Sequence, residues 1–263
     1  MSHLPIGAEK HSVRILGLPV KLVQPKSKGD IQMFENIDIY CERLDASFWA
    51  EPVNALTNIA FLLAAWSVWQ RARQLKVLSF EVRLLIVLMA SIGIGSGIFH
   101  TFATGWARFI DVLPILLFQM TYLFVYLHRL IKIQIGFITG ILALYLIVVI
   151  IARQFPHILN GSLIYAPVLL VLLLLGIHYL ASQRKEPYLL LVAVGVFMLS
   201  ITCRTFDMTI CPYFPLGIHF MWHILNSLAL YLLMRGYLAN IPIQQEHSQG
   251  NNKSLPVNGK NDD

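Results

Sequence analysis

Charged residues are scarce in this chain, at 13% of its 263 residues, whereas soluble proteins average roughly 25%. Hydrophobic residues make up 57%, and the mean hydropathy is +0.65. This shortage of charge excludes an ordinary soluble domain and predicts a polytopic membrane protein. We expect an all-α fold, because a helix satisfies its backbone hydrogen bonds within its own segment inside a bilayer.

Seven apolar runs approach the length of about 20 residues that a helix needs to cross a bilayer. They lie near residues 52–69, 84–103, 109–128, 133–152, 162–180, 188–202 and 217–234, and the sixth and shortest run could extend to residue 206. We therefore expect a bundle of seven transmembrane helices.

Basic residues are scarce in every second loop between these helices. The first, third and fifth loops carry eight, namely Arg71, Arg73, Lys76, Arg83, Arg129, Lys132, Arg184 and Lys185. The second, fourth and sixth loops carry three, namely Arg108, Arg153 and Arg204. Because Lys and Arg concentrate in cytoplasmic loops, we expect the N-terminus outside and the C-terminus in the cytoplasm.

A contiguous basic surface is also missing, so the net charge of +6 reflects loop asymmetry and predicts no nucleic-acid partner. No secretory signal is visible in residues 1–51, and the first helix is expected to target the chain. We expect three parts: an extracytoplasmic tail at 1–37, the membrane domain at 38–238, and a cytoplasmic tail at 239–263. The last is polar, with too little apolar surface to fold, and is expected to be disordered.

Ionisable side chains inside a membrane are costly and mark functional sites by default. With the orientation above, three of the expected helices place polar residues at one depth near the outer surface. These are Ser96 and His100 on the second helix, Asp111 on the third, and His219 and His223 on the seventh.

Three histidines with one open position are the ligand set of a catalytic zinc ion. His219 and His223 are four residues apart, which places both imidazoles on one helix face. His100 would supply the third ligand from another helix. A pair of this spacing is also compatible with a polar helix face, so the matching depth of His100 and Asp111 is what favours a metal.

Ser96 and Asp111 each have two interpretations. Ser96 lies between Gly93 and Gly97, a spacing of small residues typical of close helix packing, and its hydroxyl could bond a carbonyl of its own helix. It also shares a face with His100 and could stabilise an oxyanion. Asp111 could pair with Arg108, or it could act as general base towards a water molecule at the metal.

Three stretches of the sequence together carry a resemblance. They are "YCERLDASFWAEPVNALTNIAF" at 40–61, "GSGIFHTFATGWARFIDVLPI" at 95–115 and "GIHFMWHILN" at 217–226. They resemble the alkaline ceramidase family of seven-helix membrane hydrolases, part of a superfamily that includes the adiponectin and progestin receptors. The resemblance implies that His100, His219 and His223 hold zinc, while Ser96 and Asp111 assist the attack of water on an amide carbonyl.

The same resemblance implies a calcium site formed by acidic residues around the start of the first helix. Glu42 and Glu51 match two of its positions, and Asp38 or Asp45 could substitute at others, whereas Leu44 stands where an amide ligand is expected. Calcium accepts flexible oxygen geometry. The alternative is that these carboxylates are solvated or cap the first helix.

Cysteine is rare as well, with three residues in the chain. Cys41 and Cys211 match family positions that are bridged, which implies a disulfide on the outer side of the membrane. Cys203 would then be free in the sixth helix.

The residues and the resemblance together favour a zinc-dependent lipid amidase that releases a fatty acid and a sphingoid base or amine. Its substrate, ceramide or a ceramide-like N-acyl lipid, would enter from the bilayer; an ornithine lipid or an N-acyl amino acid is also compatible. The alternative is a receptor-like or scaffold protein of the same superfamily with a structural zinc, but such a site needs no base or oxyanion donor. A proton-coupled transporter would need ionisable groups along a path across the membrane, and the fourth and fifth helices nearly lack them.

Overall fold

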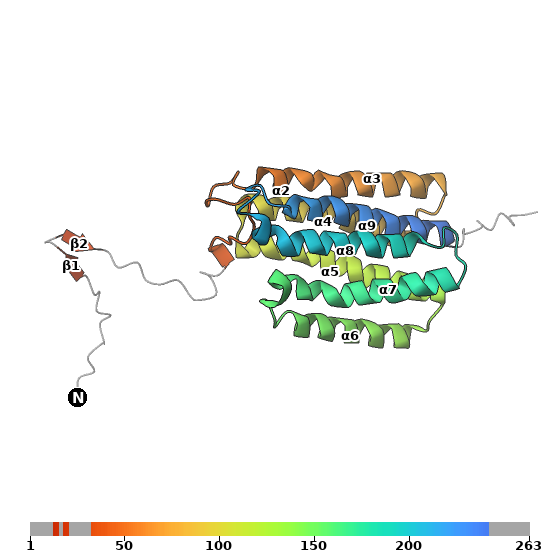
Figure 1. Ribbon diagram of the computed structural model, residues 1–263. Coiled ribbons are helices and arrows are strands. Elements are labelled where there is room, and N and C mark those ends of the chain that lie inside the picture. Colours follow the sequence, from red (N-terminus) through yellow and green to blue (C-terminus); the bar gives the residue numbers. More distant parts are fainter. Residues whose placement is uncertain (1–12, 16–17, 21–32, 242–263) are drawn as a thin grey trace, which may run out of the picture.

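The structure, a computed structural model, describes residues 13–15, 18–20 and 33–241 (Figure 1). Strands β1 (Val13–Ile15) and β2 (Leu18–Val20) form a short antiparallel hairpin in the N-terminal segment, which the sequence did not predict. The other regular elements described are helices, as expected. Residues 242–263 of the expected cytoplasmic tail, and most of 1–37, lie outside the described residues.

The helices of the bundle run from residue 52 to residue 240. In chain order they are α2 (Pro52–Thr57), α3 (Ile59–Gln74), α4 (Phe80–Phe102), α5 (Gly105–Val125), η1 (Tyr126–Ile131), α6 (Ile135–Ala152), η2 (Ile158–Tyr165), α7 (Ala166–Ala181), α8 (Leu189–Ile210) and α9 (His219–Asn240).

Six helical segments of the described chain are long and apolar enough to cross a membrane. They are Pro52–Gln74, Phe80–Phe102, Gly105–Ile131, Ile135–Ala152, Ile158–Ala181 and Leu189–Ile210. The chain therefore has the character of an integral membrane protein. Helix α9 is as long as α8, at 22 residues, but it falls outside this set because polar side chains interrupt its apolar run. The count of seven membrane-crossing helices therefore stays a prediction.

The sixth predicted helix is longer in the structure than its apolar run. It ends at Ile210, well beyond residue 202. Arg204, which we expected in a loop, therefore lies inside α8 and is 9% exposed. Its Nη1 donates to the carbonyl oxygen of Asn160 at 3.1 Å and to Ser162 Oγ at 2.9 Å. Its guanidinium also lies 5.4 Å from the ring centroid of Tyr165 and 5.9 Å from that of Trp222, so hydrogen bonds and cation–π contacts together accommodate the charge that ended the apolar run.

Helices α3 to α9 pack on one another in chain order, and α9 also packs on α3, so that α4 and α9 are the two long neighbours of α3 (Figure 1). Helix α3 packs on both of them, α5 packs on α4, and α8 packs on α9. Helix α7 packs on α8, and α6 lies at the outer edge, where it buries only Ile138 and Tyr145. The last turn of α4 and the first turns of α9 therefore meet inside the bundle rather than at its surface.

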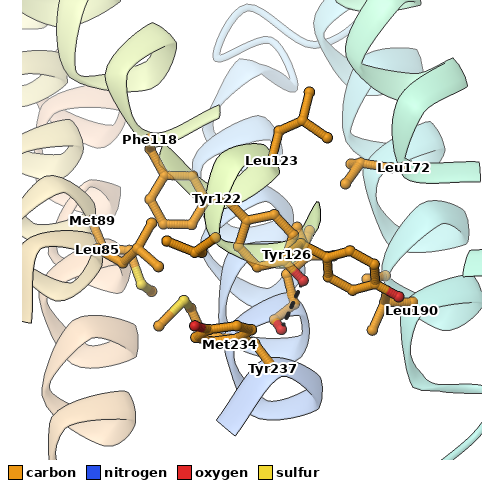
Figure 2. Close-up of a cluster of buried hydrophobic side chains, with 14 of the residues drawn as sticks. Leu85, Met89, Phe118, Tyr122, Leu123, Tyr126, Leu172, Leu190, Met234 and Tyr237 are labelled. Carbon is orange, nitrogen blue, oxygen red and sulfur yellow. Dashed lines mark hydrogen bonds between the residues drawn. The ribbon is translucent and has the colours of Figure 1, made fainter. Parts of the chain in front are cut away.

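One half of the bundle interior is lined by large apolar and aromatic side chains (Figure 2). Tyr122 and Tyr126 lie at its centre, and their hydroxyls donate to the carbonyl oxygens of Leu233 at 3.2 Å and Leu175 at 3.4 Å. Pairing these hydroxyls removes the cost of burying them. Polar chemistry is thereby confined to the other half.

The contact between α4 and α5 depends on a glycine and a proline. Pro114 lies inside α5 and has no backbone N–H, so the carbonyl of Ile110, four residues earlier, lacks its helical donor. Gly95 of α4 packs directly on that carbonyl: a Cβ at Gly95 would lie 2.5 Å from Ile110 O. This close approach brings the next residue, Ser96, towards Asp111.

We predict that Gly95→Ala lowers the free energy of unfolding by about 1–3 kcal/mol, the usual cost of overpacking. The added methyl group meets backbone that cannot move without separating α4 from α5. Thermal unfolding in detergent micelles measures the change. Gly140→Ala is the control, because a Cβ there meets nothing within 4 Å and alanine favours a helix; equal unfolding temperatures for the two variants would contradict the role of Gly95.

Candidate metal centre

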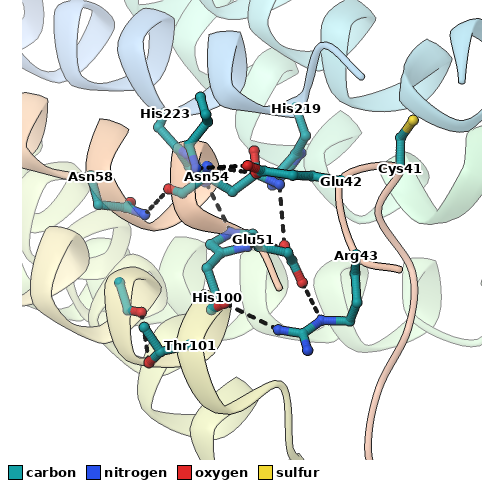
Figure 3. A network of polar contacts seen from close by, with 12 residues as sticks. Cys41, Glu42, Arg43, Glu51, Asn54, Asn58, His100, Thr101, His219 and His223 are labelled. Atoms are coloured by element: carbon teal, nitrogen blue, oxygen red, sulfur yellow. Dashed lines mark hydrogen bonds and ion pairs between the residues drawn. The ribbon is translucent and has the colours of Figure 1, made fainter. Parts of the chain in front are cut away.

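Three histidines converge where α4 ends and α9 begins (Figure 3). His100 comes from the last turn of α4, and His219 and His223 come from the first two turns of α9. One nitrogen of each ring lies within 4.8 Å of the others, and the Nε2 atoms of His100 and His223 are 3.1 Å apart. All three side chains are at most 2% exposed. This buried cluster could hold a metal ion.

The other nitrogens of two of these rings are bound to the protein. His100 Nδ1 lies 2.5 Å from Glu51 Oε2, and His223 Nδ1 lies 2.9 Å from Thr57 Oγ1. The Thr57 hydroxyl already donates to the carbonyl of Val53, so it accepts from His223. Protons on Nδ1 of both rings satisfy these two contacts and leave the Nε2 electron pairs for a ligand, the arrangement that ligands of a metal commonly show.

The remaining ring provides a test of fit. His219 Nδ1 is buried and has no hydrogen-bond partner among the described residues. A buried polar atom without a partner is costly, and a metal ligand is one way to satisfy it. The donor set, three imidazoles without a fourth protein ligand, matches a zinc site that keeps an open position.

Glu51 connects this centre to Arg43. Its Oε1 accepts from Arg43 Nε at 2.5 Å, and its Oε2 accepts from Asn54 Nδ2 at 3.1 Å in addition to His100. Burial raises the pKa of Glu51, but the hydrogen bonds from His100 and Arg43 outweigh it and hold this pKa below its usual value. The carboxylate is therefore ionised, and both of its oxygens accept hydrogen bonds from protein side chains.

The four candidate calcium ligands do not form a group. Among the described residues, the only cluster with metal-ligand spacing is the three histidines. Glu42 accepts the backbone N–H groups of Val53 at 2.7 Å and Asn54 at 2.8 Å, and so caps α2, as in the alternative interpretation. Asp45 accepts only from Ser47 N at 2.7 Å and is exposed, like Asp38. The described residues therefore give no support for the expected calcium site.

Ser96 and Asp111 line one cavity together with the three histidines. No ion pair joins Asp111 to Arg108 in the part of the chain that the structure describes, which leaves the carboxylate free to face the cavity. Helices α4 and α5 supply these two groups, and α9 supplies the histidine pair. A nucleophile activated at the metal would have both an acceptor and a hydroxyl donor within the same space.

The cavity continues from this polar end into the apolar half of the bundle. Its walls reach Leu123 on α5 and Leu233 on α9, and His223 and Leu233 are ten residues apart, about 15 Å along a helix. The lining is mostly aliphatic and aromatic. Asn226 and one polar pair interrupt it; in that pair Tyr145 donates to Gln119 Oε1 at 2.6 Å. The shape and lining fit a hydrocarbon chain whose head lies at the histidines.

Two contributors to the centre escaped the sequence analysis. Asp207 is 1% exposed, and its carboxylate accepts the backbone N–H groups of Cys41, Ile218 and His219 at 2.9, 2.7 and 2.9 Å. Tyr40 stacks on His219, with ring centroids 3.6 Å apart. Asp207 could have been found as an ionisable residue inside a membrane helix. The apolar run of the sixth predicted helix ends near residue 202, however, and therefore leaves Asp207 outside that helix.

A disulfide joins Cys41 to Cys211, the pair that the resemblance implies, with Cα atoms 5.4 Å apart. It connects the segment before α2 to the end of α8. Cys203 is free and partly buried in α8, as expected. The covalent bond and the hydrogen bond from Cys41 N to Asp207 together hold Tyr40 against His219.

The family model described as Ceramidase matches residues 39–257, which include every residue of the centre. No curated protein matches the chain.

We predict that Asp207→Ala lowers the free energy of unfolding by about 1–3 kcal/mol or more, because three N–H groups, two of them at the start of α9, lose their acceptor. Thermal unfolding in micelles measures the loss. Asp207→Asn keeps an oxygen for Ile218 and His219 and should lose less. If the alanine and asparagine variants unfold at the wild-type temperature, the carboxylate does not determine where α9 begins.

Proposed function

The chain belongs to the ceramidase family, and on that premise we propose that it hydrolyses the amide bond of ceramide or a ceramide-like N-acyl lipid with a zinc ion held by His100, His219 and His223. The observation that carries the proposal is the buried histidine cluster, which shares its cavity with a carboxylate and a hydroxyl.

Each residue of the centre has a defined part in this reaction. When bound, zinc acts as a Lewis acid that polarises the carbonyl and makes water a nucleophile near neutral pH. The Asp111 carboxylate accepts the proton of the attacking water and passes it to the amine nitrogen as the C–N bond breaks. The Ser96 hydroxyl donates a hydrogen bond to the carbonyl oxygen as that oxygen gains negative charge.

The apolar part of the cavity binds the acyl chain in this proposal. A chain that extends towards Leu123 and Leu233 would hold the amide carbon at the histidines. The products are a fatty acid and a sphingoid base or other amine. A bilayer lipid would enter sideways between helices, because both its chains are apolar and the cavity lies within the membrane-spanning bundle.

The second candidate, a receptor-like or scaffold protein with a structural zinc, has less support. A structural zinc usually has four protein ligands, whereas only three protein side chains form the cluster in the described residues. Ser96 and Asp111 beside that cluster also have no purpose in a structural site.

The wild-type protein should contain about one zinc ion per chain and release fatty acid from at least one acyl amide in a panel of ceramides, ornithine lipids and N-acyl amino acids. His219→Ala should lose both the metal and the activity. Asp111→Ala should keep the metal and lose activity by about 10²–10⁴-fold, the usual contribution of a general base. Metal content by mass spectrometry and fatty acid by chromatography measure these results.

The proposal is wrong if the protein binds zinc fully and hydrolyses none of these amides, or if metal-free protein is fully active. The first result favours the structural-zinc alternative, above all if Asp111→Ala then changes nothing.

The proposed orientation, with the centre on the extracytoplasmic side, predicts which introduced cysteines react in intact cells. Asp45 and Gln183 are both exposed and lie in loops at opposite ends of the bundle. Asp45→Cys should react with a membrane-impermeant maleimide beyond the wild-type background, and Gln183→Cys should react only after lysis. The reverse pattern would place the centre on the cytoplasmic side.

A further inference from the structure

Arg43 is a buried cation whose partners are all oxygens. Its side chain is 1% exposed. Besides Glu51 Oε1, its guanidinium donates to the carbonyl oxygens of Asp45 at 3.1 Å, Ser47 at 3.4 Å and His100 at 3.1 Å. Figure 3 shows the side chain extending from the segment before α2 to the end of α4.

One carboxylate and three carbonyl oxygens lie around the three nitrogens of this guanidinium, and carboxylate and carbonyl oxygens are the ligand types that a hard divalent cation takes. In this chain the set is filled by the protein's own guanidinium. A buried arginine is stable only when its charge and its N–H groups are paired, and here they are paired without an added ion. Glu51, an expected calcium ligand, is consequently committed to Arg43 and His100.

Arg43 also acts on one histidine from two sides. It binds the Glu51 carboxylate, which in turn accepts from His100 Nδ1. Its Nη2 atom also donates to the backbone carbonyl of His100. Side-chain orientation and backbone position of His100 therefore depend on one guanidinium. Bidentate and branched contacts of this kind are specific to arginine, whose donors form a rigid plane.

We propose that Arg43 is a positioning residue of the metal centre: it takes the place of a separate cation beside Glu51 and holds Glu51 and His100 in the geometry that exposes His100 Nε2 to the metal. This rests on the proposal that the three histidines bind zinc. It assigns a role to a residue that does not touch substrate or metal, and it makes the centre independent of calcium.

Zinc affinity, measured by competition with a chelator, tests the proposal. Arg43→Met should weaken binding about 10–100-fold, the usual effect of removing a partner that orients a metal ligand. Arg43→Lys keeps the charge but not the planar donors and should recover part of the affinity. Arg153→Met is the matched control, because Arg153 is exposed at the end of α6 and should not change binding.

A double-mutant cycle separates positioning from general destabilisation. Because Arg43 acts on His100 through Glu51 and also holds the His100 carbonyl directly, the variant that combines Arg43→Met with Glu51→Gln should bind zinc more weakly than Glu51→Gln alone, but by less than the sum of the two single losses. Fully additive losses would show that the two residues act independently and would overturn the proposal. Where Arg43→Met does not fold, the Arg43→Lys variant takes its place in the cycle.

The protonation site of His100 provides a test without metal. In metal-free wild-type protein labelled with ¹⁵N-histidine, the His100 proton should reside on Nδ1, and this preference should weaken in Arg43→Met. Wild-type protein that binds no zinc defeats the proposed function, whereas an unchanged His100 proton and unchanged zinc affinity in Arg43→Met defeat the role of Arg43.

Calcium provides the last test. Raising calcium from zero to about 1 mM, the upper range for extracellular calcium sites, should change neither the unfolding temperature nor the zinc affinity of the wild-type protein. A calcium-dependent increase in either would show that the guanidinium does not replace a cation, and would overturn that part of the inference.

Discussion

The Asp207 carboxylate determines where the last helix begins, and two of the three histidines are positioned by that start. Helix N-termini leave backbone N–H groups without partners, and inside a bundle no water is at hand to accept from them. Asp207 projects from α8 and accepts from Ile218 and His219 with one oxygen and from Cys41 with the other. Gly217 permits this approach, because it has φ +65 and a Cβ there would lie 2.2 Å from Asp207 Oδ1.

The same carboxylate couples the helices to the segment before α2. Cys41 is held by its N–H on Asp207 and by its disulfide to Cys211. Tyr40 is thereby stacked on His219, and Arg43 reaches Glu51 and the end of α4. The centre is therefore built from several separate parts of the chain, and contacts between these parts pair many of their polar groups. Loss of one contact is expected to disturb the histidine cluster through its neighbours.

The helical pattern explains why chemistry is confined to one end of the bundle. Pro114 frees a carbonyl in α5, and Gly95 lets α4 approach it, so Ser96 and Asp111 come to share a cavity with the histidines. Towards the other end, Tyr122 and Tyr126 satisfy their hydroxyls on backbone carbonyls, and the cavity walls become apolar. A lipid amide matches this division, since its polar bond and its hydrocarbon chain need opposite environments.

Several features followed from the sequence alone, because they depend on local composition and spacing. Scarce charge and long apolar runs predicted the membrane-spanning helices, and intramembrane polar residues at one depth predicted that His100, His219 and His223 would meet. The boundary of the sixth helix was misjudged, because the apolar run ends at Arg204 and Asp207, whereas the helix continues where aromatic rings and backbone N–H groups compensate these charges.

Only the tertiary structure decided what the acidic residues do. Glu51 accepts from His100 across 49 residues, and Asp207 accepts from Cys41 across 166. A carboxylate has the same letter in the sequence whether it binds calcium, caps a helix or orients a histidine. The role depends on which donors the fold brings within hydrogen-bond distance, and those donors lie on other helices.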